Sequence, residues 1–287
     1  MLFDELAATA AAVGATRSRL AKVDVLAAFL RALAPDEIVP AVGLLLGRPR
    51  QGKVGVGWRS LAATLDDAAG APTLTIAEAD AAFTDLAEAS GSGSAARRAA
   101  ILGELMNAAT ERERDALRGA LLGEVRTGAL EGVLTDAIAR ASERPAAEVR
   151  RAAMLSGDLA STALVALTGT AEDLAGTGLV VGRAIQPMLA STAPSISEAI
   201  AAVGKASVEY KLDGARIQVH RSGDDVRIFT RNLADITHRL PEIVDIVTQM
   251  PVHDVVLDGE TLALDEDDAP RAFQDTMARF GAETARD

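Results

Sequence analysis

The sequence contains no cysteine and few aromatic residues, which make up 3% of its 287 residues. Without cysteine the chain can form neither disulfides nor thiolate metal sites, and any covalent catalysis has to use another nucleophile. No apolar run approaches the roughly 20 residues that span a bilayer. The start of the chain, Met1 to Leu6, carries acids where a secretory signal carries bases. We therefore expect a cytoplasmic protein without membrane contact.

Basic residues are scarce relative to acidic ones. Residues 1–182 carry 18 basic and 23 acidic residues, a net charge of −5. Residues 183–287 carry 11 basic and 18 acidic residues, a net charge of −7. Because nucleic-acid binding relies on Lys and Arg beside phosphates, these totals argue against a basic nucleic-acid-binding domain. However, 25 of the 29 bases are arginine, whose guanidinium group suits phosphate, and only four are lysine. Each lysine can therefore be considered individually.

The first 180 residues are rich in alanine and leucine, with apolar positions at helical spacing. The pattern is clear in Val23–Leu33, Leu102–Leu122 and Leu130–Ala141, and Gly or Pro residues separate such stretches. Small residues and prolines near residue 180 then indicate a boundary. We predict a multidomain chain, with an all-helical domain over residues 1–180 and a second domain over 181–287.

Beyond Ala206 the sequence changes to short runs rich in β-forming residues. Turn sequences, Leu212–Gly214 and Ser222–Asp225, separate these runs. An antiparallel meander is the natural prediction for such a succession. The predicted strands are Val208–Lys211, Ala215–His220, Val226–Thr230 and Val255–Leu264.

Lys211 is the candidate nucleophile of the chain. The stretch from Glu209 to Arg216 reads Glu-Tyr-Lys-Leu-Asp-Gly-Ala-Arg and places this lysine between two predicted strands. A lysine amine attacks only in its neutral form, which burial or nearby positive charge favours. Arg216, Arg231 or a bound metal could supply that charge. The alternative is an ordinary exposed lysine in a turn.

An acidic residue follows in the last predicted strand. Glu260 is flanked by apolar residues, and a buried carboxylate without a partner is costly. It could pair with an internal arginine and be purely structural. Alternatively, it could accept hydrogen bonds from a ribose or help to hold a metal, while Arg231 contacts phosphate or ribose oxygens.

These motifs resemble those of ATP-dependent DNA ligases, in the nucleotidyltransferase superfamily that also contains RNA ligases and messenger RNA capping enzymes. Lys211-Leu-Asp-Gly214 resembles the nucleotidyl-lysine motif, Thr230-Arg-Asn232 the next motif, and Asp258-Gly-Glu260 the one after. The resemblance implies that residues 181–287 are the first part of an antiparallel-sheet nucleotidyltransferase, or adenylation, domain. It also implies ATP and Mg²⁺ as cofactors.

The same resemblance implies a role for each matching residue. Lys211 would form the AMP-lysine bond. The other residues would bind the nucleotide or its metal: Glu209 at the adenine, Arg216 and Arg231 at the sugar or phosphates, Glu260 at the ribose, and Asp213 together with Glu260 at Mg²⁺.

Upstream segments distinguish between branches of the superfamily. Gly55–Trp58, Leu121–Gly132, Val149–Ala152 and Gly182–Ala190 resemble the DNA-binding domain and linker of bacterial and archaeal ATP-dependent ligases. Within the second segment, small residues around Gly128 would let backbone amides reach phosphates, and Arg126 would enter the minor groove. The alternatives are a helix cap for Gly128 and a core aromatic for Trp58.

The resemblance implies an enzyme that seals nicks in duplex DNA. AMP would pass from ATP to the lysine and then to a 5′-phosphate, which a 3′-hydroxyl would attack. We expect a monomer that is truncated within the adenylation domain, because the later motifs and a C-terminal OB domain should follow Asp287; recruitment by a sliding clamp stays open. The alternatives are an RNA ligase or capping-type enzyme, which the helical half argues against, and a non-catalytic DNA-binding fragment.

Overall fold

The computed structural model describes residues 1–287 except for residues 53, 63–67, 125–129, 189, 268 and 282–287. The chain divides into two compact units. The first unit contains residues 1–153 and 158–177, and the second contains residues 154–157 and 178–287. None of the described helices is long and apolar enough to cross a membrane.

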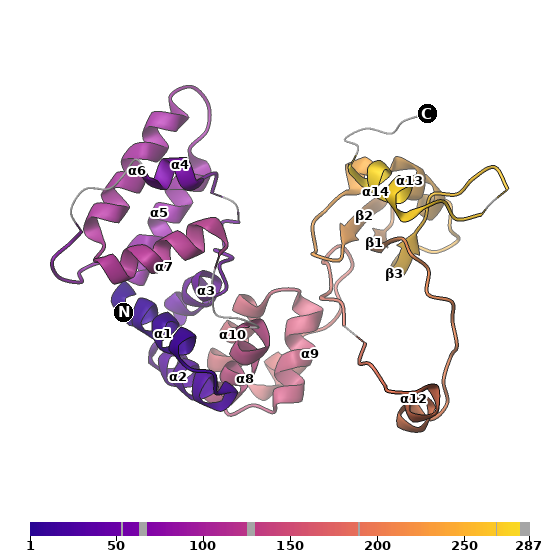
Figure 1. The fold of residues 1–287 in the computed structure, drawn as a ribbon, viewed down its shortest axis with the longest axis horizontal. Helices are drawn as coiled ribbons and strands as arrows, with labels where there is room; N and C mark the ends of the chain where they lie inside the picture. Colours follow the sequence, from indigo (N-terminus) through magenta and orange to yellow (C-terminus); the bar gives the residue numbers. More distant parts are fainter. Residues whose placement is uncertain (53, 63–67, 125–129, 189, 268, 282–287) are drawn as a thin grey trace. The chain divides into compact units, whose positions relative to one another are not determined.

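The first unit is helical, as the sequence predicts (Figure 1). Helix α2 packs along α8, α3 packs against α10, and α1 contacts both α2 and α7. The apolar stripes of these helices meet in one core, which includes Phe3, Leu26 and Phe83. The helices are α1 (Phe3–Ala15), α2 (Arg19–Ala32), α3 (Pro35–Leu45), α4 (Trp58–Ala62), α5 (Ile76–Glu88), α6 (Ser94–Ala108), α7 (Glu111–Leu122), α8 (Leu130–Ser142), α9 (Ala146–Ser156), α10 (Leu159–Thr168) and α11 (Ala171–Ala175).

Local sequence signals set several helix ends in this unit. The Thr75 and Thr110 side chains each accept a hydrogen bond from the backbone N–H of a glutamate three residues later. The carboxylate of that glutamate accepts a hydrogen bond from the threonine backbone N–H. Such a capping box satisfies backbone groups that the first turn leaves unpaired. Helix α7 ends at Gly123, whose positive φ of 67° closes the last turn.

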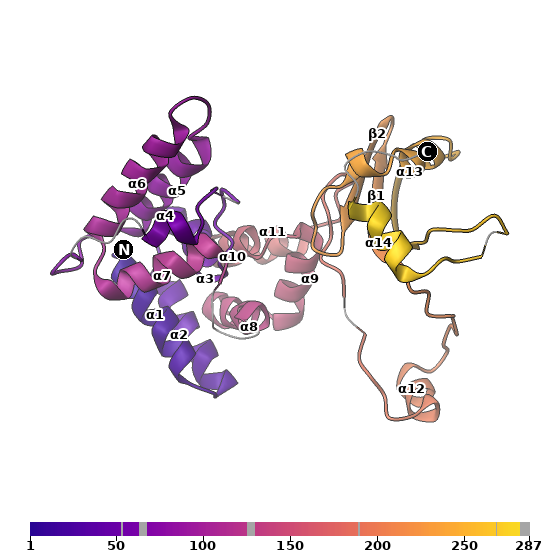
Figure 2. The ribbon, with the colours of Figure 1, turned by 45° about the horizontal axis from the view of Figure 1, so that its top comes forward.

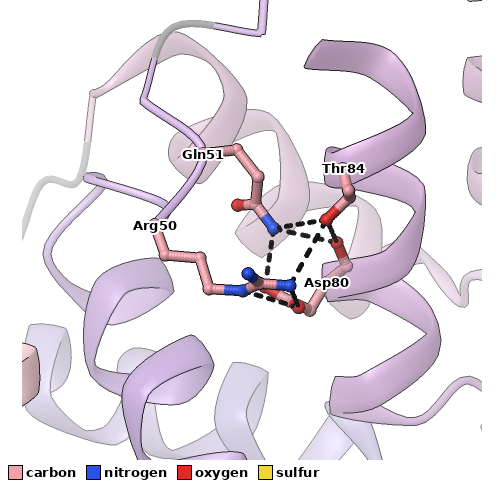
Figure 3. Close-up of polar contacts among 4 residues, drawn as sticks. All are labelled: Arg50, Gln51, Asp80 and Thr84. Atoms are coloured by element: carbon pink, nitrogen blue, oxygen red, sulfur yellow. Dashed lines mark hydrogen bonds and ion pairs between the residues drawn. The ribbon is translucent and has the colours of Figure 1, made fainter. Parts of the chain in front are cut away.

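A polar cluster ties the segment after α3 to α5 (Figure 3). The Arg50 guanidinium binds Asp80 through Nε at 2.9 Å and Nη2 at 2.6 Å. The Gln51 amide donates to Asp80 Oδ1 at 2.8 Å and to Thr84 Oγ1 at 2.9 Å. The Asp80 carboxylate raises the pKa of Arg50 through this hydrogen bonding. The cluster therefore fixes the start of the loop that leads to α4.

The second unit is built on a three-stranded antiparallel sheet, as predicted, but the predicted meander is wrong, because the third strand pairs with the first strand and not with the second. Strand β1 (Ala215–Ser222) lies between β2 (Asp225–Thr230) and β3 (Asp254–Thr261). Ile217 and Val219 belong to a small apolar core, to which helix α13 (Pro241–Thr248) contributes Val247. Figure 2 shows α13 beside the strands of this sheet. The remaining elements are α12 (Ile196–Val203), the 3₁₀ turn η1 (Thr237–Arg239) and α14 (Phe273–Gly281).

One predicted strand is wrong in this structure. Residues Val208–Lys211 form no strand, and the side chains of Val208 and Tyr210 are 90% and 96% exposed. A strand needs a neighbouring strand to satisfy its backbone groups, and none of the described residues pairs with this stretch. The last predicted strand, Val255–Leu264, is present but ends earlier, at Thr261.

Candidate functional site

The Lys-Leu-Asp-Gly motif contacts the end of β3 through its glycine. The Gly214 N–H donates a hydrogen bond of 3.1 Å to Glu260 Oε1. A Cβ atom at Gly214 would overlap the carbonyl oxygen of Thr261 and lie 2.7 Å from Leu262 Cδ2. Only glycine therefore allows the motif to approach β3 so closely. The contact joins two motifs that lie 46 residues apart in the chain.

Arg216 and Asp258 form a bidentate ion pair on the same sheet face. Arg216 Nε and Nη2 donate to the two Asp258 carboxylate oxygens at 3.0 and 2.7 Å. This hydrogen bonding raises the pKa of Arg216, and the charge of Glu260, directly across from Arg216 in the strand register, acts in the same direction. The pair holds one guanidinium group in a fixed orientation beside the Gly214–Glu260 contact.

A segment before the sheet covers the adjoining part of this face. The Gln218 side chain accepts from the Ile185 N–H at 2.9 Å and donates to the Ile185 carbonyl at 2.5 Å. His220 Nδ1 accepts from the Gly182 N–H at 3.1 Å. Burial lowers the pKa of His220, so the ring is neutral at physiological pH. These contacts agree with a structural role for His220.

Lys211 lies outside the packed part of the site. Its side chain is 87% exposed, and its Nζ atom lies 3.7 Å from Asp213 Oδ1. Glu209, two residues earlier, is also exposed and accepts a hydrogen bond of 3.0 Å from Ser207 Oγ. The structure thus brings Gly214 and Glu260 together but leaves Lys211 and Glu209 on an exposed segment.

Arg231 lies in the turn that follows β2. The Thr230 N–H donates to the Ala234 carbonyl, the Thr230 carbonyl accepts from the Leu233 N–H, and Leu233 has a positive φ of 63°. Arg231 is exposed, and none of the described residues accepts a hydrogen bond from its side chain. Its guanidinium group is therefore available to a ligand.

At the candidate site, the carboxylates of Asp213 and Glu260 are the oxygen ligands that we consider for a metal. The described residues hold no group of three acidic or histidine side chains in metal-binding arrangement. Asp213 is exposed, and Glu260 uses one of its two carboxylate oxygens for the Gly214 amide. Mg²⁺ is usually held by one or two carboxylates together with substrate phosphates, and this donor set fits that mode.

Asp258 is a site residue that the motif analysis does not assign. The spacing Asp258-x-Glu260 places both acids on one face of β3, because side chains alternate along a strand. That spacing is the feature of the sequence from which a place for Asp258 in the site could have been predicted. In the strand register, Arg216 lies directly across from Glu260, and Gln218 lies directly across from Asp258. Arg216 nevertheless binds Asp258. The ion pair is therefore diagonal.

In the first unit, the predicted DNA contacts Arg126 and Gly128 lie outside the described residues. Trp58 is 60% exposed, so it is not a core aromatic. Its side chain lines a cavity of about 640 Å³ whose walls include Leu6, Arg118 and Glu124. The lining of this cavity therefore contains both apolar and charged residues.

Comparison with known proteins identifies the family. The model of the ATP dependent DNA ligase domain matches residues 187–287, and the model of the DNA ligase N terminus matches residues 2–73 and 69–139. A protein of Pseudarthrobacter chlorophenolicus named "Probable DNA ligase" is 65% identical over 286 residues, which is 100% of this chain and 56% of the relative. One of Rhodococcus jostii with the same name is 51% identical over 288 residues, or 57% of its length.

The fold agrees with these matches. A solved structure named "Pmar-Lig_Pre." superposes with a TM-score of 0.53 at 19% identity, over 95% of this chain and 52% of the other. The chain spans a little over half the length of the curated relatives that it matches. Because both family models describe the same kind of enzyme and together cover most of the sequence, the chain belongs to the ATP-dependent DNA ligase family.

Proposed function

We propose that this chain carries the lysine that receives AMP from ATP in a DNA ligase reaction. The observation that supports this most directly is the hydrogen bond between Gly214 and Glu260. It brings the Lys-Leu-Asp-Gly motif and the Asp-Gly-Glu motif into one site, next to the oriented guanidinium group of Arg216. Lys211 is four residues from β1 and open to an incoming substrate.

The first chemical step is a nucleotidyl transfer. The neutral Nζ of Lys211 attacks the α-phosphorus of ATP, and a nitrogen–phosphorus bond forms. The bond from this phosphorus to the oxygen that bridges to the β-phosphate breaks, pyrophosphate leaves with the electron pair, and the amine proton passes to solvent. Such chemistry depends on positioning and on stabilising negative charge, and it needs neither cysteine nor a histidine base.

Several residues would bind the nucleotide. Arg231 would offer its guanidinium group to phosphate or ribose oxygens, and Arg216, whose Nε and Nη2 donate to Asp258, would offer its remaining N–H groups. Glu260 has a second carboxylate oxygen for the ribose. Glu209 would contact the adenine. Mg²⁺ bound with ATP would neutralise phosphate charge, with Asp213 and Glu260 as the carboxylates that this chain offers it.

The later steps involve DNA. In the proposed reaction the AMP passes to the 5′-phosphate at a nick, and a 3′-hydroxyl then displaces it to seal the strand. The helical domain, residues 1–180, would bind the duplex with Arg126 and Gly128 among its contacts, and residues 181–287 would contribute to adenylation. The match of residues 2–139 to the N terminus of DNA ligases supports DNA over RNA as the substrate. We further propose a cytoplasmic monomer acting in replication, repair and recombination.

Mass spectrometry after incubation with labelled ATP and Mg²⁺ tests the nucleophile. The assay uses the chain alone and the chain mixed with the part of the Pseudarthrobacter relative that it does not match. We expect AMP on Lys211 and its loss in Lys211→Arg, because a guanidinium group does not become a neutral amine. The matched control is Lys205→Arg, an exposed lysine six residues earlier, which should keep the adduct. AMP on another residue, or no adduct in either mixture, would refute the proposal.

A further inference from the structure

The turn that carries Arg231 is closed as a three-residue hairpin loop. The Leu233 N–H donates to the Thr230 carbonyl at 2.9 Å, and the Thr230 N–H donates to the Ala234 carbonyl at 2.9 Å. The Ala234 N–H also donates to Thr230 Oγ1 at 3.2 Å. These three hydrogen bonds define the shape of the loop and place Arg231 and the residue after it at its tip.

Leu233 occupies a backbone position that favours glycine. Its φ of 63° lies in the left-handed region, where a bulky side chain is strained and where such a loop commonly has glycine. Among the described residues, the one other non-glycine residue with a positive φ is Glu143, at 55°, between α8 and α9. Strained backbone positions cluster where they serve a function. A leucine in this place therefore indicates a role for its side chain that glycine cannot fill.

The Leu233 side chain is half-buried against another part of its own unit. Gly157 approaches this side chain and the backbone of Ala184 closely. A Cβ atom placed on Gly157 would lie 3.5 Å from Leu233 Cδ1 and 2.4 Å from the Ala184 carbonyl oxygen. Leu233 thus packs where two backbone segments meet, and Gly157, with a φ of 66°, has the residue type that this close approach requires.

The segment that contains Ala184 is itself held on β1. The next residue, Ile185, donates its N–H to the Gln218 side chain at 2.9 Å and accepts from it at 2.5 Å. Because β1 also carries Arg216, the packing of Leu233 ties the loop of Arg231 to the strand that carries the other guanidinium group of the candidate site.

We propose that Leu233 is a positioning residue for Arg231. The hydrogen bonds of the loop fix its shape, and the packing of Leu233 fixes its orientation relative to β1. The exposed guanidinium group of Arg231 then extends from a loop that is already ordered, so less conformational entropy is lost when it binds phosphate or ribose oxygens. This inference deepens the proposed function and rests on it for the role of Arg231.

The rate of adduct formation, measured against ATP concentration, tests the role of Leu233. The assay uses the same mixture as the test of Lys211. Leu233→Gly allows the left-handed backbone but removes the packing contact. We expect the ATP concentration for half-maximal rate to rise about fivefold and the maximal rate to change by less than about twofold, because binding is weakened and the chemical step is not. Leu233→Met keeps an apolar side chain of similar volume and should restore the behaviour of the unaltered chain.

A double-mutant cycle with Arg231→Ala separates positioning from simple stabilisation. If Leu233 acts through Arg231, Leu233→Gly should change the half-maximal ATP concentration by less than about twofold once Arg231 is alanine. The matched control is Glu143→Gly, which places glycine at the other left-handed position and should not change the ATP dependence. Additive effects of Leu233→Gly and Arg231→Ala, an unchanged ATP dependence in Leu233→Gly, or an equal effect of Glu143→Gly would overturn the proposal.

Titration calorimetry with Mg-ATP distinguishes this inference from the proposed function. If the unaltered protein forms no adduct, the proposed function fails, and the same cycle is measured in the dissociation constant of Mg-ATP. Weakening of Mg-ATP binding by Arg231→Ala and Leu233→Gly that is not additive would then leave the role of Leu233 standing. Binding that Arg231→Ala does not weaken, or no binding of Mg-ATP at all, would overturn that role as well.

Discussion

Replacing Gly214 with alanine should separate the two motifs that form the candidate site. The added Cβ would overlap the Thr261 carbonyl oxygen and lie 2.7 Å from Leu262 Cδ2 and 3.0 Å from Glu260 Cγ. Non-bonded carbon atoms normally lie about 3.5–4.0 Å apart, so the end of β3 has to move by roughly 1 Å. Such a shift lengthens the Gly214–Glu260 hydrogen bond beyond its useful range.

The expected cost has two parts. Overpacking in a folded protein typically costs about 1–3 kcal/mol. The hydrogen bond from Gly214 to the Glu260 carboxylate is exposed to solvent, so its loss should add about 0.5–1.5 kcal/mol. The free energy needed to open the β1–β3 pair should therefore fall by about 1.5–4.5 kcal/mol in Gly214→Ala.

Hydrogen exchange of the β1 backbone amides measures this opening, and the yield of AMP adduct measures its effect on activity. The matched control is Gly259→Ala, on β3, where an added Cβ meets no atom within 4 Å. That variant should change stability by less than about 1 kcal/mol. Equal exchange rates and equal adduct yields in the two variants would show that the close approach of Gly214 to β3 does not matter.

Three further predictions concern charge, pH and DNA. Asp258→Asn removes the charged partner of Arg216 and should lower adduct formation about tenfold while the β1 amides keep their protection, as exchange and adduct assays on one sample can show. Burial lowers the pKa of His220 below its ordinary value of 6.5, so the unfolded chain binds the proton first and stability should fall as pH drops below about 6.5. Between about pH 7.5 and pH 5.5 the urea midpoint of unfolding should fall in the unaltered chain and in His253→Gln. In His220→Gln this fall of the midpoint should be absent. If the helical domain binds duplex DNA, Arg126→Ala should weaken binding equally for all sequences and flatten its salt dependence; salt-independent binding by the unaltered chain would contradict that role.

Local sequence patterns were sufficient to predict a helical first unit and three of the four strands expected in the second unit. Helical spacing and capping pairs such as Thr75 with Glu78 and Thr110 with Glu113 act within a few residues, so the helices of the first unit could be predicted. The turn at Gly223 joins β1 and β2 directly, which makes this hairpin readable from sequence as well. The Lys-Leu-Asp-Gly motif likewise identified the family.

Contacts between distant residues were decided only by the tertiary structure. Val208–Lys211 has a strand-like sequence, but a strand forms only where another chain segment pairs with it, and no local pattern shows whether that partner is present. The diagonal pairing of Arg216 with Asp258 follows from the strand register. The need for glycine at position 214 comes from the approach of Thr261, which is 47 residues away in the chain and adjacent only once β1 and β3 pair.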